Sequence, residues 1–348
     1  MELAAILVVP AIASALSLSP LGQRLAAPVT LAATAIVLAL AANLAATAAG
    51  VGHVDAAGGW LTCDGLSALV LVLVAFVGFA AALFSWGYFG ARRFPATEAK
   101  LRQYYGLYNL FILAMLAVPI LANAALVWIA VEMTTLIAAF LVGFEDTPEA
   151  LEAAWKFVVL TTLGAVFALL GVLILYWGSR VAGSEPFTWA GLVRAAPHVP
   201  PALVWPAFLL ILVGFGTKIG IVPMHTWMPD AYSQAPAPIC ALLSGVETTA
   251  ALYVILRLLP VVGLAPGLDA GPWLIGFGLL SVAVATLLLV FVRDFKRLFA
   301  FSTVEQMGII LIATGLGGAD AHLGAVYQMT GHAIAKSFAF FAVGATVL

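Results

Sequence analysis

A lysine stands in an apolar, glycine-rich run of this sequence. Residues 214–232 read GFGTKIGIVPMHTWMPDAY, with Lys218 near the start, and no charged residue occurs between Ala202 and Val213. Burial in apolar surroundings favours a neutral amine, whereas a nearby carboxylate favours the charged ammonium. A lysine whose carboxylate partner moves closer or farther can therefore bind and release a proton. We expect Lys218 to take part in proton transfer, with an acid on a neighbouring helix.

Two glutamates stand near the centres of their own apolar segments. Glu132 occurs in ALVWIAVEMTTLIAAFL and Glu247 in ALLSGVETTAALYVILR. An ionisable group at the centre of a bilayer costs about 2.5–3.5 kcal/mol on insertion scales, so such residues are usually functional. Glu132 is short and central, and its side chain cannot extend to the membrane surface. We predict that Glu132 and Lys218 form the proton-transfer pair, and that Glu247 also transfers protons.

A stripe of polar residues occurs near the end of the chain, in YQMTGHAIAKSFAFF. Gln328, His332 and Lys336 recur every four residues, which places them on one face of a helix. A polar stripe on a membrane helix is typical of a hydrated proton path, so we predict proton transfer by His332 and Lys336. The possible supporting residues are His225, Asp230, Lys156, Glu305 and Gln328. We expect no catalytic residue in the usual sense.

Most of these residues also have a purely structural interpretation. Lys218 is near enough to a helix end for its side chain to extend to the surface. His332 alone would fit a helix-contact histidine, and His225 and Asp230 would fit residues at the membrane surface. Glu305 stands near the start of a helix, where a carboxylate favours the helix dipole.

The composition determines the class of protein that must hold these charges. Of 348 residues, 64% are apolar and 9% are charged, compared with about 25% charged in soluble proteins. Many apolar runs are long enough to cross a bilayer as helices, and the alternating segments of a membrane β-barrel do not occur. The sequence therefore predicts an all-α, polytopic membrane protein. Eleven helices are expected, over residues 2–19, 28–49, 64–88, 104–122, 123–144, 155–177, 203–222, 238–259, 272–292, 299–316 and 322–347.

The basic residues between these helices predict an orientation. Nine fall on one side, namely Arg24, Arg92, Arg93, Lys100, Arg102, Lys156, Arg293, Lys296 and Arg297, and three on the other, namely Arg180, Arg194 and Arg257. Cytoplasmic loops carry the excess of Lys and Arg. We expect a multi-pass protein of the cell's inner (plasma) membrane with its N-terminus outside and Leu348 in the cytoplasm.

The seventh helix is expected to be broken. Gly214, Gly216, Gly220 and Pro223 weaken regular helix around Lys218. Free backbone groups at membrane depth are tolerated only within protein or beside a water-filled cavity, and discontinuous helices mark ion sites in transporters. The break therefore favours an ion or proton site at Lys218.

Several other function classes are disfavoured. The net charge is −2, which does not indicate nucleic acid, and Cys63 and Cys240 are far apart without the spacing of an iron–sulfur site. Only His332 lies clearly inside a predicted span, which disfavours haem. No dinucleotide fingerprint or P-loop occurs. We expect no cofactor and no metal in this chain.

Five motifs resemble a known family. These are WIAVEMTTL, GFGTKIGIVPMHTWMPDAY, APAPICALLSG, RDFKRLFAFSTVEQMGI and HAIAKSFAFF. They resemble the antiporter-like membrane subunits of complex I, Mrp-type cation/proton antiporters and membrane-bound hydrogenases. The string STVEQMGI, which contains Glu305, is most similar to component F of hydrogenase-4-type complexes. The resemblance extends from about residue 60 to the end of the chain.

The resemblance implies a fold of two inverted five-helix repeats. Residues 1–103 would form three N-terminal helices, 104–260 the first repeat and 261–348 part of the second. It also implies that Glu132 and Lys218 are the family's proton-transfer pair, with His332 and Lys336 as a link onward. Glu247 is a departure, because relatives often carry Lys or His on that helix. Relatives have about fourteen helices, so we expect this chain to be truncated at its C-terminus.

These observations lead to one functional prediction and two alternatives. We predict a non-catalytic, proton-translocating membrane subunit of a respiratory-type oxidoreductase complex, either of NADH-quinone oxidoreductase or of hydrogenase type. Its partners would be the other membrane and peripheral subunits, and redox chemistry would occur in them. The first alternative is an Mrp-type cation/proton antiporter subunit, with Na+ as a possible second ion. The second is a passive membrane scaffold.

Overall fold

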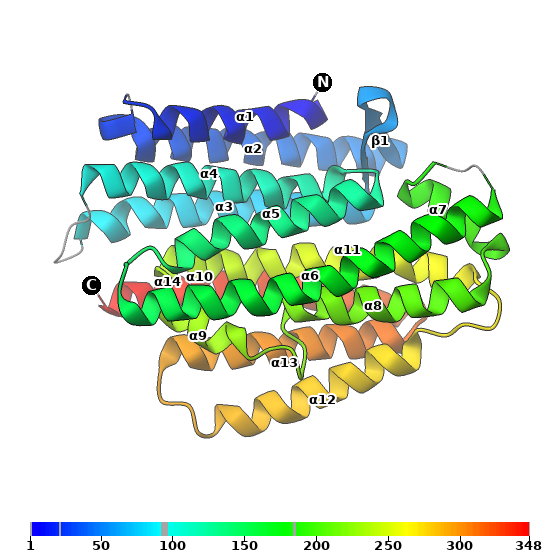
Figure 1. The fold of residues 1–348 in the computed structure, drawn as a ribbon. Helices are drawn as coiled ribbons and strands as arrows, with labels where there is room; N and C mark the ends of the chain where they lie inside the picture. The colour runs from blue at the N-terminus through cyan, green and yellow to red at the C-terminus, as the bar shows by residue number, and fades with distance from the viewer. Residues whose placement is uncertain (1, 21, 92–96, 184–185, 348) are drawn as a thin grey trace.

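The computed structural model describes residues 2–20, 22–91, 97–183 and 186–347, without the side chains of Gln23, Arg24 and Val347. Four residues used in the orientation prediction therefore lie outside the described part, either wholly or in their side chains. They are Arg24, Arg92, Arg93 and Leu348. The structure is a bundle of roughly parallel and antiparallel helices (Figure 1). The long helices are α1 (Glu2–Leu18), α2 (Gly22–Val51), α3 (Gly65–Ala91), α4 (Glu98–Ile120), α5 (Ala124–Val142), α6 (Pro148–Ala182), α8 (Pro201–Ile219), α11 (Thr248–Leu264), α12 (Gly271–Leu289), α13 (Phe295–Leu316) and α14 (Ala319–Val347).

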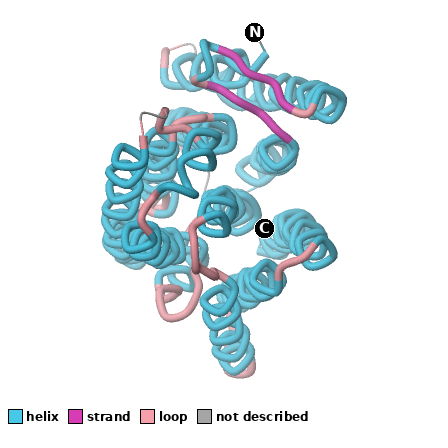
Figure 2. The backbone as a smooth tube through the Cα atoms, turned by 90° about the vertical axis from the view of Figure 1, so that its right-hand side faces the viewer, coloured by secondary structure: helices cyan, strands magenta, loops and turns pink. Residues whose placement is uncertain are grey.

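Shorter elements join these helices. They are α7 (Trp189–Ala195), α9 (Trp227–Gln234), α10 (Ala237–Leu242), 3-10 turns at Ala57–Gly59 and Ala196–His198, and a π-helical turn at Leu243–Glu247. Strands β1 (His53–Ala56) and β2 (Leu61–Asp64) form an antiparallel hairpin in which His53 pairs with Asp64. In Figure 2, where most helices are seen nearly end-on, the hairpin lies across the near end of the first helices. The sequence did not predict the hairpin, α7 or α9.

The membrane character of the bundle is confirmed. Among the described residues, nine helices are long and apolar enough to cross a membrane. The segment Ala237–Leu264, which joins α10, the π-turn and α11, counts as one of them. Each of the eleven expected ranges is mostly helical, but α1 has only 17 residues and α14 is not among the nine. The prediction of eleven spans is therefore only partly confirmed, and the structure does not test the inverted repeats.

Small residues let neighbouring helices approach closely. A Cβ atom on Gly214 of α8 would lie 2.5 Å from the carbonyl oxygen of Gly164 on α6. Gly278 of α12 and Gly308 of α13 meet in the same way, with clearances of 2.7 and 2.8 Å to each other's carbonyl oxygens. Such contacts are the usual basis of helix association in membranes, where burial of apolar surface gives little driving force. The contact at Gly164 and Gly214 fixes the distance between α6 and α8.

The seventh helix is broken, as predicted. Helix α8 ends at Ile219, and Gly220 adopts the left-handed conformation with φ 76°. The amide of Ile221 donates to the carbonyl of Gly216 at 3.0 Å, a bond that closes many helix ends. The chain then turns back into the short helix α9. Lys218 therefore lies one residue before the end of a helix inside the bundle.

The helix end is stabilised by side chains from outside α8. The indole of Trp227 donates to the carbonyl of Thr217 at 2.8 Å, and the hydroxyl of Ser281 on α12 accepts from the amide of Val222 at 3.0 Å. Unpaired backbone groups at membrane depth would cost several kcal/mol each, roughly. These contacts explain how the break is tolerated within the protein.

Candidate functional site

The ammonium group of Lys218 makes a direct ion pair with Glu247. Lys218 Nζ lies 2.7 Å from Glu247 Oε1, and the two side chains are only 4% and 1% exposed. The ring of Phe157 lies beside the ammonium, 5.4 Å from its centroid. Breaking a buried pair leaves an uncompensated charge, at a cost of about 3–5 kcal/mol. Each partner therefore holds the other inside the bundle.

Glu132 belongs to the same cluster but is one hydroxyl group away. Lys218 Nζ donates to Thr135 Oγ1 at 2.6 Å, and Thr135 Oγ1 lies 3.5 Å from Glu132 Oε2. The other carboxylate oxygen of Glu132 accepts from Thr162 Oγ1 on α6 at 3.0 Å. Glu132 is half-buried, and it lines a small cavity together with Lys218. The structure thus brings Glu132 and Lys218 into one site, while the direct ion pair is made by Glu247.

Four helical segments position this cluster. Glu132 and Thr135 are three residues apart on α5, so they share a face of that helix. Asn123 caps the start of α5 by accepting from the amides of Ala125 and Leu126. Glu247 is the last residue of the π-turn. A π-turn adds a residue to the helix and re-aims the side chains that follow, and it occurs often at functional sites. Thr135 and Thr162 were missed by the sequence analysis, although the spacing of Thr135 from Glu132 was a usable signal.

The polar stripe on α14 forms a second cluster, which contacts the π-turn and α13. His332 Nε2 lies 2.9 Å from the carbonyl oxygen of Ser244, and Ser244 Oγ lies 2.7 Å from Thr303 Oγ1. Lys336 donates to the hydroxyl of Ser302, and its ammonium lies 5.6 Å from the ring centroid of Phe299. Both His332 and Lys336 are buried. The second cluster therefore reaches the π-turn that ends in Glu247.

Two supporting candidates lie at the margin of this second cluster. Gln328 donates to the side chain of Gln306 on α13. The carboxylate of Glu305 interacts electrostatically with Lys336. The structure therefore joins Gln328 and Glu305 to α13 and α14 rather than to Lys218.

The remaining supporting candidates lie elsewhere. Asp230 on α9 accepts from Lys156 of α6 at 3.0 Å and from Arg297 of α13 at 2.8 Å, and these side chains are partly exposed. Asp230 thus ties α9 to two long helices at the bundle end opposite the hairpin (Figure 1). His225 is buried in the turn after α8, away from the Lys218 cluster.

A further ion pair lies at the hairpin end of the bundle. Arg257 of α11 donates to both oxygens of Asp64, with Nη1 2.6 Å from Oδ2. It also donates to Ser67 Oγ and to the hydroxyl of Tyr253, which donates to the carbonyl of Pro119. Burial by itself raises the pKa of Asp64, but the hydrogen bonds and charge of Arg257 more than offset this and lower it. The sequence alone placed Arg257 among the loop residues and did not indicate this network.

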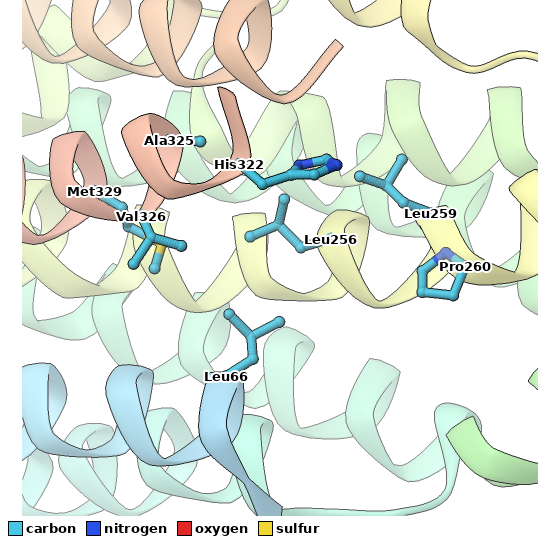
Figure 3. Close-up of a pocket in the computed structure, with 8 residues that line it drawn as sticks. All are labelled: Leu66, Leu256, Leu259, Pro260, His322, Ala325, Val326 and Met329. Carbon is cyan, nitrogen blue, oxygen red and sulfur yellow. The ribbon is translucent and has the colours of Figure 1, made fainter. Parts of the chain in front are cut away.

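One pocket of the described chain carries little acid–base chemistry. It has a volume of about 400 Å³, lies between α3, α11 and α14, and is lined by apolar side chains and His322 (Figure 3). His322 is the one titratable group among its lining residues. Within the described residues, no three His, Cys, Asp or Glu side chains gather as metal ligands would.

A broken helix that presents a lysine to carboxylates inside a membrane bundle is typical of ion-translocating proteins. The family model described as "NADH:quinone oxidoreductase/Mrp antiporter, TM" matches residues 121–348. The chain belongs to this family of antiporter-like membrane subunits, as its motifs suggested.

Two curated relatives extend the match. A hydrogenase-4 component F homolog from Methylacidiphilum infernorum is 38% identical over 302 residues, which cover 83% of this chain and 62% of the relative. NADH-quinone oxidoreductase subunit N from Desulforudis audaxviator is 30% identical over 293 residues, which cover 82% of this chain and 55% of the relative. The chain thus spans less than two thirds of the length of either relative.

A solved structure agrees with the fold. A chain in the structure of the membrane-bound sulfane sulfur reductase, an archaeal respiratory membrane complex, superimposes with a TM-score of 0.88 and 26% identity. The alignment covers 99% of this chain and 71% of that one. The similarity therefore includes the N-terminal helices that the family model does not match.

Proposed function

We propose that this chain is a proton-translocating membrane subunit of a respiratory-type oxidoreductase complex, of NADH-quinone oxidoreductase or hydrogenase type. The single observation that carries this proposal is the buried ion pair of Lys218 and Glu247, linked through Thr135 to Glu132. A passive scaffold has no use for such costly charges. The named relatives, which belong to hydrogenase-4 and to NADH-quinone oxidoreductase, support the choice of complex.

Proton transfer in this proposal is carried by Glu132, Lys218, Glu247, His332 and Lys336. The first three form one cluster, and the π-turn joins it to the other two through the Ser244 carbonyl. Redox cofactors would reside in partner subunits, and a conformational change there would shift the equilibrium among these buried charges. This chain's own part is to hold each proton at a defined oxygen or nitrogen atom and to exclude bulk water between them.

Variants of the native complex in inverted membrane vesicles test the proposal. Glu132→Gln and Lys218→Ala should leave electron transfer to artificial acceptors intact while proton pumping falls. Glu149→Gln, an exposed glutamate at the start of α6, is the matched control. Wild-type pumping in both test variants would overturn the proposal and favour a passive scaffold.

A second function uses the same charges. The family description names Mrp antiporters as well as quinone oxidoreductases, so an Mrp-type cation/proton antiporter subunit is the alternative. Transport that depends on Na+ and needs no electron donor would favour it.

An orientation goes with the proposed function. Lys100, Lys156, Lys296 and Arg297 belong to the basic set, and in Figure 1 the starts of α4, α6 and α13 lie at the end opposite the hairpin. By the positive-inside rule that end faces the cytoplasm. The hairpin and α7 would then face the outside.

A further inference from the structure

We propose that Lys218 acts as a mobile positive charge for which Glu132 and Glu247 compete, and that Thr135 is the group on which the ammonium pivots. This inference rests on the proposed function and revises one part of it, because Lys218 would position the protons without carrying one itself. The protons would travel on the two carboxylates, while Lys218 keeps its own three N–H protons and changes partner.

The geometry provides one amine and two acids in a single cluster. The ammonium contacts Glu247 Oε1 at 2.7 Å and Thr135 Oγ1 at 2.6 Å. Thr134 Oγ1 also lies 3.2 Å from Glu247 Oε1, which helps to hold that carboxylate. One ammonium can neutralise only one carboxylate, so the cluster carries an unbalanced negative charge when both acids are ionised. Protonation of either acid removes this imbalance.

Thr135 connects the two positions of the ammonium. Its hydroxyl accepts from Lys218 and faces Glu132 Oε2 at 3.5 Å, a distance at the limit of a hydrogen bond. A movement of the ammonium toward Glu132 would therefore begin from a contact that already exists. Glu132 and Lys218 also line one small cavity together.

The cycle needs only the transported protons. When Glu247 takes up a proton and Glu132 releases one, one O–H bond forms and one breaks, and the ammonium moves from Glu247 to ionised Glu132. When Glu132 takes up the next proton and Glu247 releases its own, the ammonium returns to Glu247. No N–H bond of Lys218 breaks in either step. The ammonium thus lies beside whichever acid is ionised, and the other acid is protonated.

Lys218→Arg tests whether the lysine must lose a proton. A guanidinium group keeps its charge at every working pH and does not exchange protons in this way. A mobile charge predicts that Lys218→Arg retains proton pumping within about threefold of wild type, whereas Lys218→Ala loses more than about tenfold. An assembled Lys218→Arg complex that transfers electrons but pumps as poorly as Lys218→Ala would overturn the inference.

Variants of the two other groups provide a test that does not depend on the fit of arginine. Glu247→Gln should lock the ammonium on Glu132 and lower pumping more than about tenfold, with Glu247→Asp as a smaller change that keeps the charge. Thr135→Val removes the pivot and should also lower pumping, while Thr135→Ser keeps the hydroxyl and should restore it. Wild-type pumping in Glu247→Gln and Thr135→Val, with pumping lost in Glu132→Gln, would overturn this inference and leave the proposed function standing. Wild-type pumping in all variants would overturn both.

Discussion

Ser244 and Glu247 lie on one π-helical turn, and through it two polar clusters meet. The carboxylate of Glu247 pairs with Lys218, and the carbonyl of Ser244 contacts the imidazole of His332. In a π-turn the backbone bonds run from residue i to i+5, so the local register differs from that of the flanking α10 and α11. Because both contacts depend on this register, a change in the contact at one end of the turn should alter the contact at the other end.

His332→Leu should weaken the link between the clusters. The substitution removes the imidazole that contacts the Ser244 carbonyl at 2.9 Å, although Thr248 Oγ1 still donates to the same oxygen at 2.6 Å. We expect a loss of about 1 kcal/mol in stability, because a buried carbonyl loses one side-chain partner. We also expect proton pumping to fall while the Lys218–Glu247 pair stays in place. Thermal unfolding in detergent and pumping in vesicles measure the two effects.

A matched substitution separates the two roles of His332. His332→Gln keeps a side-chain N–H donor that can reach the carbonyl but cannot be protonated. Restored stability without restored pumping would indicate a proton-transfer role, whereas restoration of both would indicate that His332 only positions the turn.

The contact between α6 and α8 should be intolerant of a single methyl group. Gly214→Ala would place a Cβ atom 2.5 Å from the Gly164 carbonyl oxygen and the same distance from the Ala168 amide nitrogen. The helices must then move apart, at a cost of about 1–3 kcal/mol. Because α6 carries Thr162 and α8 carries Lys218, we expect pumping to fall as well.

Gly276→Ala is the control for this substitution. Gly276 lies on α12, and a Cβ atom there would meet nothing within 4 Å. Alanine is the better helix former, so stability should be unchanged or slightly raised. Equal unfolding temperatures for Gly214→Ala and Gly276→Ala would contradict the close approach of α6 and α8.

The sequence predicted the helices and the break but not the partner of Lys218. Apolar length determines where helices occur, and Gly220 with Pro223 indicated where α8 ends, because these residues interrupt a helix whatever surrounds them. Whether Glu132 or Glu247 makes the ion pair with Lys218 depends on how α5 and α11 are rotated about their axes. The π-turn shifts that rotation for Glu247 in a way that a period of 3.6 residues does not anticipate. Asp64 and Arg257 are 193 positions apart, so their pairing could not be read from local spacing.

The Asp64–Arg257 pair should make the stability of the folded protein depend on pH. The pKa of Asp64 in the folded protein is lowered from 3.8, so the ionised form is favoured by folding. Its contribution is fully present above the unfolded value and is lost as the pH falls through the lower, folded value. The unfolding temperature of the wild type should therefore fall below about pH 4 more steeply than that of Asp64→Asn, which lacks the titrating group. Parallel pH profiles for the two proteins between pH 3 and 7 would contradict this prediction.

Cysteine labelling should determine the orientation of the bundle. Cys63 and Cys240 are buried, and burial, with the neighbouring Asp64 carboxylate, raises the pKa of the Cys63 thiol to about 11. Both native thiols should therefore react slowly, since the thiolate is the reactive form. Glu149 and His198 are exposed near opposite ends of α6. With the N-terminus outside, a membrane-impermeant maleimide should label His198→Cys in intact cells and Glu149→Cys only after the membrane is opened. The reverse pattern would invert the orientation, and with it the side from which protons reach Glu132.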